Sequence, residues 1–495
     1  MWKKVILNFL ILIGVLVISN YVYTKWFFED DLKKNSDIIQ IVRDLPRETE
    51  IVYVAESSNI TYRMDDLDKR KISEFIGDYY PDIKVSDLTK AASHAGIYKV
   101  LLEQIPRESK VKTVIITLNL RSFNAQWIYS NLETALQKSV VLLKNNPPLV
   151  NRFLLSFKAY DIKTDKERQA QIISYWKSEK FKTQHLPYKN VIEWDRFMAQ
   201  RGILDSSGKY DTVLTPLACS YIKTYAFELD TLNNPRIKDF DKIIKLAKKR
   251  GWNLVFNLLP ENLEQTNRLV GKELVQMIEH NSTILKKYYT NKGVLVVDNL
   301  HLVKDDQFID RDFPTEHYAE QGRKAIAEQV SNQLKCWYGS KYKTPVYTTK
   351  LKTTFLNTCE NSEIWNQGQT ITTEKSHSGT KSSLFYGENP YSITLEYPIG
   401  RLSDSLKNQV TISFWYFHSS DSEASLIIES IKINQYHNTN QYLYTDRKFK
   451  KGNWEFYSRT IVLEERMKKA DVLKIFLYNP GGDKKYVDDF YVGFE

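Results

Sequence analysis

The sequence predicts an α/β protein built as a three-layer sandwich around a mostly parallel sheet, with an all-β sandwich after it and a transmembrane helix before it. Between residues 50 and 335, about five short apolar runs alternate with helical stretches, as in a parallel sheet covered on both faces. From Ser362 to Glu495 the helical period disappears and short alternating runs take its place. The first 28 residues contain one long uncharged segment.

This uncharged segment runs from Val5 to Thr24 and follows Lys3 and Lys4. At ~1.5 Å per residue, a helix of this length is about 30 Å long and can cross a bilayer. Its basic flank should stay in the cytoplasm, which places the rest of the chain outside. A cleaved signal peptide is the alternative, but no Ala-x-Ala-like site follows. We therefore expect residues 1–28 to be a retained anchor.

The composition is that of a globular protein with two or three domains, at 495 residues, 42% hydrophobic and 26% charged. The net charge of +10 comes from basic residues scattered along the whole chain, which argues against nucleic acid as a partner. Cys219, Cys336 and Cys359 have no metal-ligand spacing. Cys336 and Cys359 could pair, but buried unpaired thiols are the simpler expectation.

The first stretch with reactive potential is residues 51–62. A β-branched and aromatic run, Ile51 to Val54, reads as a buried strand and is followed by Ala55, Glu56, Ser57 and Ser58. A serine at the carboxyl end of a strand in an open α/β sheet is well placed to act as a nucleophile. Serine in this position is also a common turn former or helix cap.

The second stretch is residues 308–330. His317 stands five residues before Gly322-Arg323, at the beginning of a helical run. An early serine followed by a late acid and histidine, with this Gly-Arg helix, resembles the SGNH (GDSL-type) hydrolases and acyltransferases. The resemblance implies that Ser57 is the nucleophile and His317 its base, with Ser58 as the one-residue alternative.

The other sequence blocks of that family are found in altered form. The Gly-Asp-Ser block would be Ala55-Glu56-Ser57. The resemblance further implies two oxyanion donors: the backbone N–H of Gly96, and the side chain of Asn119 at the end of the strand Val114–Leu118.

The acid that orients the histidine usually stands three residues before it, where this chain has Pro314. Asp312 is the preferred candidate, with Asp310 and Glu316 as alternatives.

The expected α/β domain spans residues 29–345, with an insertion at about 145–232 that is either a lid over the site or a peripheral subdomain. Aromatic side chains near and within this insertion are available to stack on sugars, or they are plain core: Trp127, Trp176 and Trp194. His94 is either a ligand contact or, more simply, a structural histidine. Further helices are expected at Asp65–Ile76, His94–Ile105, Leu132–Leu143, before Gly251, and at Leu263–Tyr289, and further strands at 83–85, 253–259 and 294–297.

The expected β-sandwich spans residues 355–495. Its segments SHSGTKSSLFYG, VTISFWYF and YVDDFYVGF resemble jelly-roll carbohydrate-binding modules. Asp488 and Asp489 fit either a structural role or a bound calcium ion.

Together, these resemblances imply a serine esterase or O-acetyltransferase that acts on O-acyl groups of a cell-envelope polysaccharide. Such an enzyme needs no metal or nucleotide cofactor. It would sit in the bacterial inner membrane with its bulk on the periplasmic side, beside a membrane-bound O-acyltransferase. The departures Ala55, Glu56 and Pro314 motivate the alternative of an inactive glycan-binding or assembly subunit.

Overall fold

The computed structural model describes residues 2–36, 38–144, 146–160, 162–181, 186–310, 313–347, 352–360, 365–366, 370–418, 424–433, 435–443 and 447–495. The chain forms two compact units. The first consists of residues 1–62 and 70–345, and the second of residues 63–69 and 346–495.

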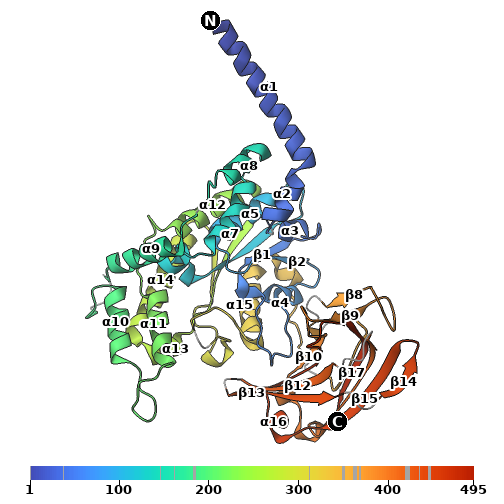
Figure 1. Cartoon of the computed structure of the whole chain (residues 1–495). Helices are drawn as coiled ribbons and strands as arrows, with labels where there is room; N and C mark the ends of the chain where they lie inside the picture. Colours follow the sequence, from blue (N-terminus) through green and yellow to red (C-terminus); the bar gives the residue numbers. More distant parts are fainter. Residues whose placement is uncertain are drawn as a thin grey trace. The chain divides into compact units, whose positions relative to one another are not determined.

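The first unit contains a five-stranded sheet in the order β2-β1-β3-β4-β5, with all neighbours parallel. Figure 1 labels β1 and β2 of this sheet. Its strands are β1 (Ile51–Ala55), β2 (Val85–Thr89), β3 (Thr113–Leu118), β4 (Asn253–Leu258) and β5 (Leu295–Asp298). The strand order reverses between β1 and β3. In open α/β sheets, the carboxyl ends of the strands at such a reversal form the crevice that holds ligands.

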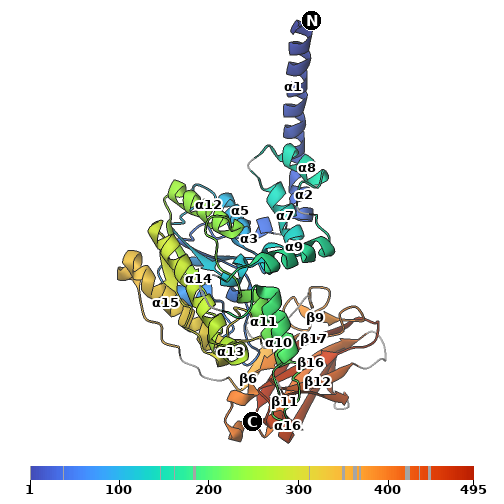
Figure 2. The ribbon, with the colours of Figure 1, turned by 90° about the vertical axis from the view of Figure 1, so that its left-hand side faces the viewer.

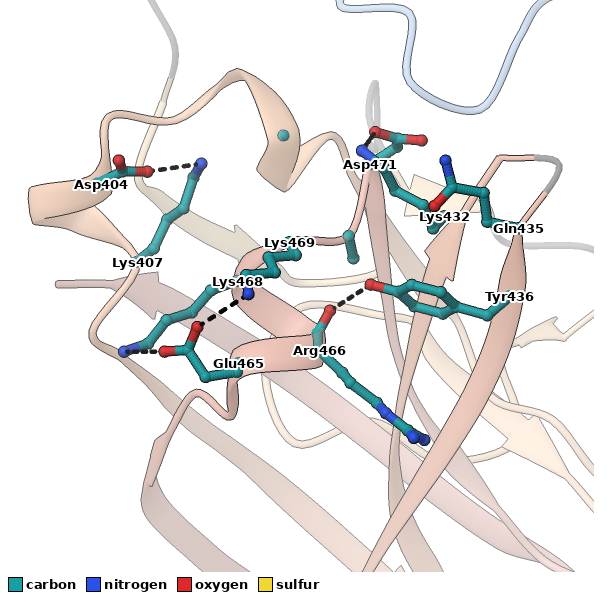
Figure 3. A pocket seen from close by; sticks show the side chains of 12 residues that line it. Asp404, Lys407, Lys432, Gln435, Tyr436, Glu465, Arg466, Lys468, Lys469 and Asp471 are labelled. Atoms are coloured by element: carbon teal, nitrogen blue, oxygen red, sulfur yellow. Dashed lines mark hydrogen bonds and ion pairs between the residues drawn. The ribbon is translucent and has the colours of Figure 1, made fainter.

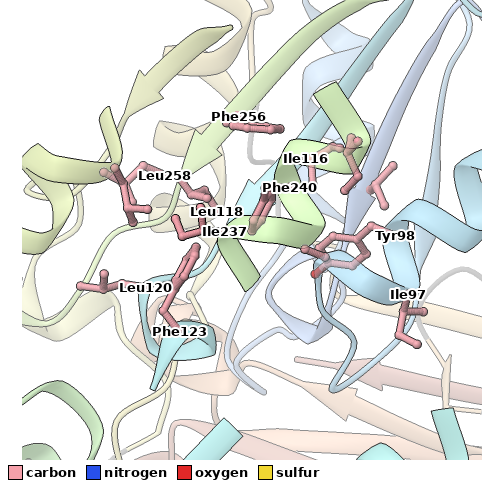
Figure 4. Packing of buried hydrophobic residues seen from close by; sticks show 14 of the residues in the cluster. Ile97, Tyr98, Ile116, Leu118, Leu120, Phe123, Ile237, Phe240, Phe256 and Leu258 are labelled. Carbon is pink, nitrogen blue, oxygen red and sulfur yellow. The ribbon is translucent and has the colours of Figure 1, made fainter. Parts of the chain in front are cut away.

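The β1 and β3 strands are buried along their whole length, which explains why they are mostly apolar and do not alternate, with Thr113 and Thr117 as the polar positions of β3. One face packs against α5 (Ala95–Gln104), α12 (Pro235–Arg250) and α14 (Lys272–Asn291). Figure 4 shows this packing for Ile116, Leu118, Phe256 and Leu258 of the sheet and Tyr98, Ile237 and Phe240 of the helices. The other face carries α4 (Ile72–Asp78) and α15 (Glu320–Tyr338), and the Tyr80 hydroxyl after α4 donates to the carbonyl of Ser331 at 2.6 Å.

Two expected helices differ in the structure. The helix predicted over Asp65–Ile76 begins only at Ile72, because residues 63–69 leave the first unit and belong to the second. The helix predicted over Leu263–Tyr289 is two helices, α13 (Leu263–Leu269) and α14, which are separated at Gly271 with φ +125°. Because an L residue rarely adopts that φ, the glycine marks the break.

The N-terminal segment is α1 (Trp2–Trp26), followed by α2 (Phe28–Asn35) and α3 (Ile38–Arg43). α1 is long and apolar enough to cross a membrane, and its apolar side chains are exposed. A retained anchor and a signal sequence both have these properties.

In the described part of the insertion there are four helices: α8 (Pro148–Ser156), α9 (Asp165–Ser178), α10 (Val191–Arg201) and α11 (Leu214–Tyr225). The short helices α6 (Ala125–Ile128) and α7 (Glu133–Leu142) precede it. Trp176 and Trp194 are buried in the hydrophobic core, so neither offers a ring to a sugar. The third tryptophan proposed for stacking, Trp127, lines a cavity that is described below.

The second unit consists of two antiparallel sheets. One has the order β13-β12-β16-β10-β7; the other has the order β14-β15-β11-β17-β9-β8, with β6 also paired to β17. The bounds are β6 (Thr354–Asn357), β7 (Trp365–Asn366), β8 (Ile371–Thr372), β9 (Ser382–Phe385), β10 (Thr394–Tyr397), β11 (Gln409–His418), β12 (Ser425–Lys432), β13 (Tyr436–Leu443), β14 (Arg447–Lys451), β15 (Trp454–Val462), β16 (Val472–Tyr478) and β17 (Lys485–Phe494), with one short helix, α16 (Glu465–Lys468). Alternate residues of β11 enclose the core, among them Ile412, Phe414 and Tyr416.

Residues 63–69 are held on this second unit by ion pairs. Lys69 Nζ lies 3.1 Å from Glu396 Oε2 on β10, and Lys474 Nζ of β16 lies 3.3 Å from the other oxygen of the same carboxylate. Asp65 lies 3.7 Å from Arg401.

All three cysteines are free thiols, so Cys336 and Cys359 are not bridged; Cys219 and Cys359 are buried, whereas Cys336 is exposed.

Candidate functional site

Ser57 lies at the carboxyl end of β1, in a 3₁₀ turn formed by Ser57–Asn59. The turn is fixed by Glu56, whose carboxylate accepts hydrogen bonds from the backbone N–H of Ser58 at 2.5 Å and from its hydroxyl at 2.9 Å. This arrangement leaves Ser57 Oγ 2.8 Å from Nε2 of His317. Ser57, and not Ser58, is therefore the serine in contact with the histidine.

His317 stands in a loop that leads into α15, and its other ring nitrogen contacts an acid. Nδ1 of His317 lies 2.6 Å from Oδ2 of Asp310, and the hydroxyl of Thr315 donates to the same carboxyl oxygen. Burial by itself would raise the pKa of Asp310, but the hydrogen bonds from His317 and Thr315 outweigh it and lower that pKa. An ionised Asp310 holds the proton on Nδ1 and leaves Nε2 free to accept the proton of Ser57.

Asp312, the preferred sequence candidate for this acid, lies outside the described residues. Of the two alternatives, Asp310 contacts His317, whereas Glu316 points elsewhere.

Glu316 forms a buried ion pair with Arg121, which follows β3. Arg121 Nη2 lies 2.5 Å from Glu316 Oε2, and Nη1 donates to the carbonyl of Pro314 at 2.8 Å. The guanidinium also stacks on Trp127, 4.6 Å from the ring centre. These contacts of Arg121 hold the loop that carries His317 against the carboxyl end of β3.

Two further buried carboxyl groups lie behind Ser57. Burial raises the pKa of Glu56, and the charge of Glu316 adds to this effect. Burial likewise raises the pKa of Glu261 well above the usual range, and the Tyr225 hydroxyl donates to Glu261 at 2.5 Å. The positive charge of Arg121 acts on both carboxyl groups and partly opposes this rise in their pKa.

A cavity of about 110 Å³ opens beside Ser57 and His317. Its wall is mixed, with apolar contributions from Tyr98, Trp127, Phe240 and Phe313 and polar ones from Asn119 and Arg121. A site of this size suits a small group and not a long alkyl chain.

The two expected oxyanion donors are placed differently. Asn119 lines the cavity, and its side-chain amide donates to Glu316 at 2.9 Å. Gly96 does not line this cavity, and its backbone N–H donates to Nδ1 of His94 at 3.1 Å. The structure therefore brings Ser57, His317 and Asn119 together and leaves Gly96 outside the group.

His94 has a structural role and also lines the cavity. It is buried, caps the N-terminus of α5, and has Arg236 Nη1 2.7 Å from its Nδ1. Because Nδ1 accepts from Gly96 and faces an arginine, the ring proton belongs on Nε2.

A second, larger cavity of about 570 Å³ lies in the β-sandwich unit (Figure 3). Its lysines are paired with acids: Lys432 with Asp471 at 2.6 Å and Lys407 with Asp404 at 3.1 Å. The described residues that line it include no serine, cysteine or histidine.

No family model matches the sequence, and no curated protein is similar to it. Among solved structures, the chain is similar to the CBM22-1 xylan-binding domain of Paenibacillus barcinonensis Xyn10C, with 13% identity over 28% of this chain and 92% of that one and a TM-score of 0.21. The C-terminal family 22 carbohydrate-binding module of Clostridium thermocellum Xyn10B gives 10% identity over 28% and 91%, with a TM-score of 0.21. TmCBM61 in complex with β-1,4-galactotriose gives 15% identity over 26% and 88%, with a TM-score of 0.17. Likenesses this weak carry no conclusion about what this chain binds.

Sequence reasoning missed Arg121 and the part played by Glu316. A usable signal was present, because an arginine two residues after Asn119 and an acid beside His317 are complementary charges on two loops that meet at the same sheet edge.

Proposed function

We propose that the α/β unit is a serine-dependent esterase or O-acyltransferase that acts on O-acyl groups of a cell-envelope polysaccharide. The observation that carries the proposal is the continuous hydrogen-bond chain Ser57–His317–Asp310 at the strand-order reversal, with a small cavity beside it. A nucleophile, a base and an acid in this order are what acyl transfer requires.

In this mechanism, Ser57 Oγ attacks the acyl carbonyl carbon while His317 Nε2 takes the hydroxyl proton. The tetrahedral intermediate collapses, the C–O bond to the leaving alcohol breaks, and His317 returns the proton to that alcohol. Water or a glycan hydroxyl then attacks the acyl-serine by the same steps in reverse. Asp310 stabilises the imidazolium that forms in each half-reaction.

The negative charge of the intermediate needs donors near Ser57. Asn119 lines the cavity, and one of its two amide hydrogens is used by Glu316, which leaves the second for the oxyanion. Gly96 would donate to the oxyanion only if its backbone N–H no longer bonded to Nδ1 of His94.

The location and the glycan partner belong to the same proposal. The length and apolar character of α1 support a membrane anchor that leaves the two units on the extracytoplasmic side of a bacterial inner membrane. Aromatic side chains on the outer face of the larger sheet, among them exposed Phe449 and half-buried Trp415 and Phe456, support a sugar-binding surface. A membrane-bound O-acyltransferase is the proposed source of the acyl group.

The test is the hydrolysis of an aryl acetate, and labelling by a fluorophosphonate, with the full chain in detergent. We expect Ser57→Ala and His317→Ala each to lower kcat/KM by on the order of 10⁴-fold or more, because members of such a triad act as a unit. Ser58→Ala should cost far less, since Ser58 faces Glu56. Equal activity of wild type and Ser57→Ala would reject the serine mechanism.

The second candidate is a catalytically inactive glycan-binding or assembly subunit. The hydrogen bond from Gly96 to His94 favours it, because one expected oxyanion donor is already used. If the wild-type serine is not labelled while cells still need the protein to acylate their envelope glycan, this candidate replaces the first.

A further inference from the structure

Three large apolar side chains of α8 are exposed on one side of that helix. The exposed fractions are 43% for Val150, 47% for Phe153 and 80% for Phe157, which is the C-cap residue of the helix. Their spacing of three and four residues places them on one stripe of the helix. Asn151 and Leu155 are buried and occupy the face that packs on the protein.

α8 is fixed beside the end of α1, where Figures 1 and 2 both show it. The backbone N–H of Leu149 donates to the side chain of Asn20 at 3.0 Å. Arg152 Nε lies 2.8 Å from Asp31 of α2, and the same carboxylate oxygen accepts from the Tyr23 hydroxyl at 2.7 Å. These polar contacts hold α8 at the level of residue 20 of the apolar helix.

That level corresponds to a definite depth if α1 spans a bilayer. Asn20 precedes the end of the uncharged segment, Thr24, by four residues, or about 6 Å of helix. A helix beside it therefore lies at the boundary between the acyl chains and the headgroups. Exposed Trp26 and Phe27 sit just beyond, as aromatic residues do at membrane interfaces.

We propose that α8 is an interfacial membrane helix whose Val150, Phe153 and Phe157 insert into the extracytoplasmic leaflet next to α1. The proposal rests on the membrane anchor of the proposed function. A bilayer fits this stripe better than a protein partner does, because the stripe is continuous with the anchor, and Arg152 and Lys158 flank it as basic residues flank interfacial helices.

The consequence is attachment at two places. A single span lets the attached unit rotate and tilt about one connection, whereas a second helix lying in the interface fixes the orientation of that unit on the membrane. α8 packs on α7, and α7 packs on α5, the helix that begins at the wall of the Ser57 cavity. The cavity would thus keep a constant orientation relative to a membrane-bound acyl donor.

The experiment uses the full chain in phosphatidylcholine/phosphatidylglycerol nanodiscs, with Cys336→Ser to remove the exposed thiol. Nitroxide spin labels are placed one at a time through Phe153→Cys, Phe157→Cys and, as the control on the same helix, Ser156→Cys, an exposed polar position whose hydroxyl accepts from Arg152 at 2.9 Å. Leu204→Cys is a second control, because Leu204 is an equally apolar position, 61% exposed, far from α1 in the same unit. Val15→Cys reports on the anchor itself.

We expect the ratio of accessibility to oxygen over accessibility to a water-soluble nickel chelate to be about tenfold higher at Phe153 and Phe157 than at Ser156 and Leu204. If the labels at Phe153 and Phe157 match the two controls while Val15 is in lipid, the interfacial helix is wrong and the anchor stands. If Val15 is also in water, the anchor fails and the inference fails with it. Spin–spin broadening at Phe153 and Phe157 would instead assign the stripe to a second copy of this chain and overturn the lipid proposal.

Discussion

At the scale of single residues, the contact between His317 and Asp310 determines which ring nitrogen carries the proton. Asp310→Asn should keep the geometry but favour the wrong tautomer, so we expect kcat to fall by about 10⁴-fold. The measurement is aryl acetate hydrolysis under single-turnover conditions. Asp306→Asn is the control, because Asp306 is an exposed acid of the same segment whose carboxylate accepts from the side chain of Gln307. If Asp310→Asn lowered kcat by less than tenfold, another acid would have to orient His317.

The Arg121–Glu316 pair makes a separate prediction about stability. Glu316→Gln leaves the Arg121 charge buried without its counter-ion, and removing one partner of a buried pair costs about 3–5 kcal/mol. We expect the free energy of unfolding in urea to fall by that amount. The double variant Arg121→Met/Glu316→Leu should recover most of the loss, because it removes both charges of the pair and leaves neither of them buried alone. A single variant as stable as wild type would mean that water already solvates the pair.

Part of this site could be predicted from the residues and part could not. Ser57 and His317 follow from their order and their position after strands, which are properties of the sequence. The acid was left open between Asp312, which was preferred, and Asp310 and Glu316, because the family position three residues before His317 holds Pro314. The contact of Asp310 with His317 depends on the fold, since the two residues stand seven positions apart in the chain. Gly96 was expected at the oxyanion from the family resemblance, and the competing acceptor on His94 lies only two residues earlier in the chain.

At the scale of elements, continuous apolar runs located the parallel strands well, because burial on both faces leaves little room for polar residues. The strand expected at 83–85 was placed early, since β2 begins at Val85 and its outer positions are half-buried and mixed in character. The break between α13 and α14 was missed, because an apolar helical period continues across Gly271 and one backbone angle ends the helix.

Gly271 therefore supports a prediction. With φ at +125° and a Cβ that would meet the Glu273 carboxylate at 2.9 Å, Gly271→Ala should destabilise the first unit by about 1–3 kcal/mol. Gly339→Ala is the control, because Gly339 has helical φ and nothing within 4 Å of the added methyl group. Thermal unfolding of both variants measures the difference, and equal melting temperatures would show that the turn can rearrange.

At the scale of the whole molecule, the second unit includes seven residues that the sequence pattern assigned to the first. Lys69 and Lys474 share Glu396; burial would raise the pKa of Glu396, but the two lysines lower it. A lowered pKa in the folded state stabilises the fold above the unfolded pKa, and this stabilisation is lost as pH falls. The assignment of residues 63–69 to the second unit could not be predicted, because nothing local to that segment specifies a partner more than 300 residues away.

Lys69→Met should thus weaken the β-sandwich at neutral pH and leave it unchanged at an acid pH below the lowered pKa of Glu396, where that carboxyl is protonated in both states. We expect the free energy of opening of β10 and β16, measured by amide hydrogen exchange on the full chain, to fall by about 1.5 kcal/mol at pH 7. Lys484→Met is the control, because its pair with Glu374 is about half exposed and should contribute little. A loss that persists at low pH would show that packing of the lysine stem, and not its charge, holds the segment.

The position of residues 63–69 also has a consequence for protein synthesis. This segment leaves the ribosome about 280 residues before the first residue of the unit that receives it, which at 5–20 residues per second is roughly 15 to 55 seconds. Arg323 donates hydrogen bonds to the carbonyls of Thr61 and Arg70, which stand on either side of this segment, and Arg323 is also translated late. A nascent chain would thus carry residues 57–70 for many seconds before Arg323 and the second unit exist, so that the proposed activity would appear only near the completion of the polypeptide.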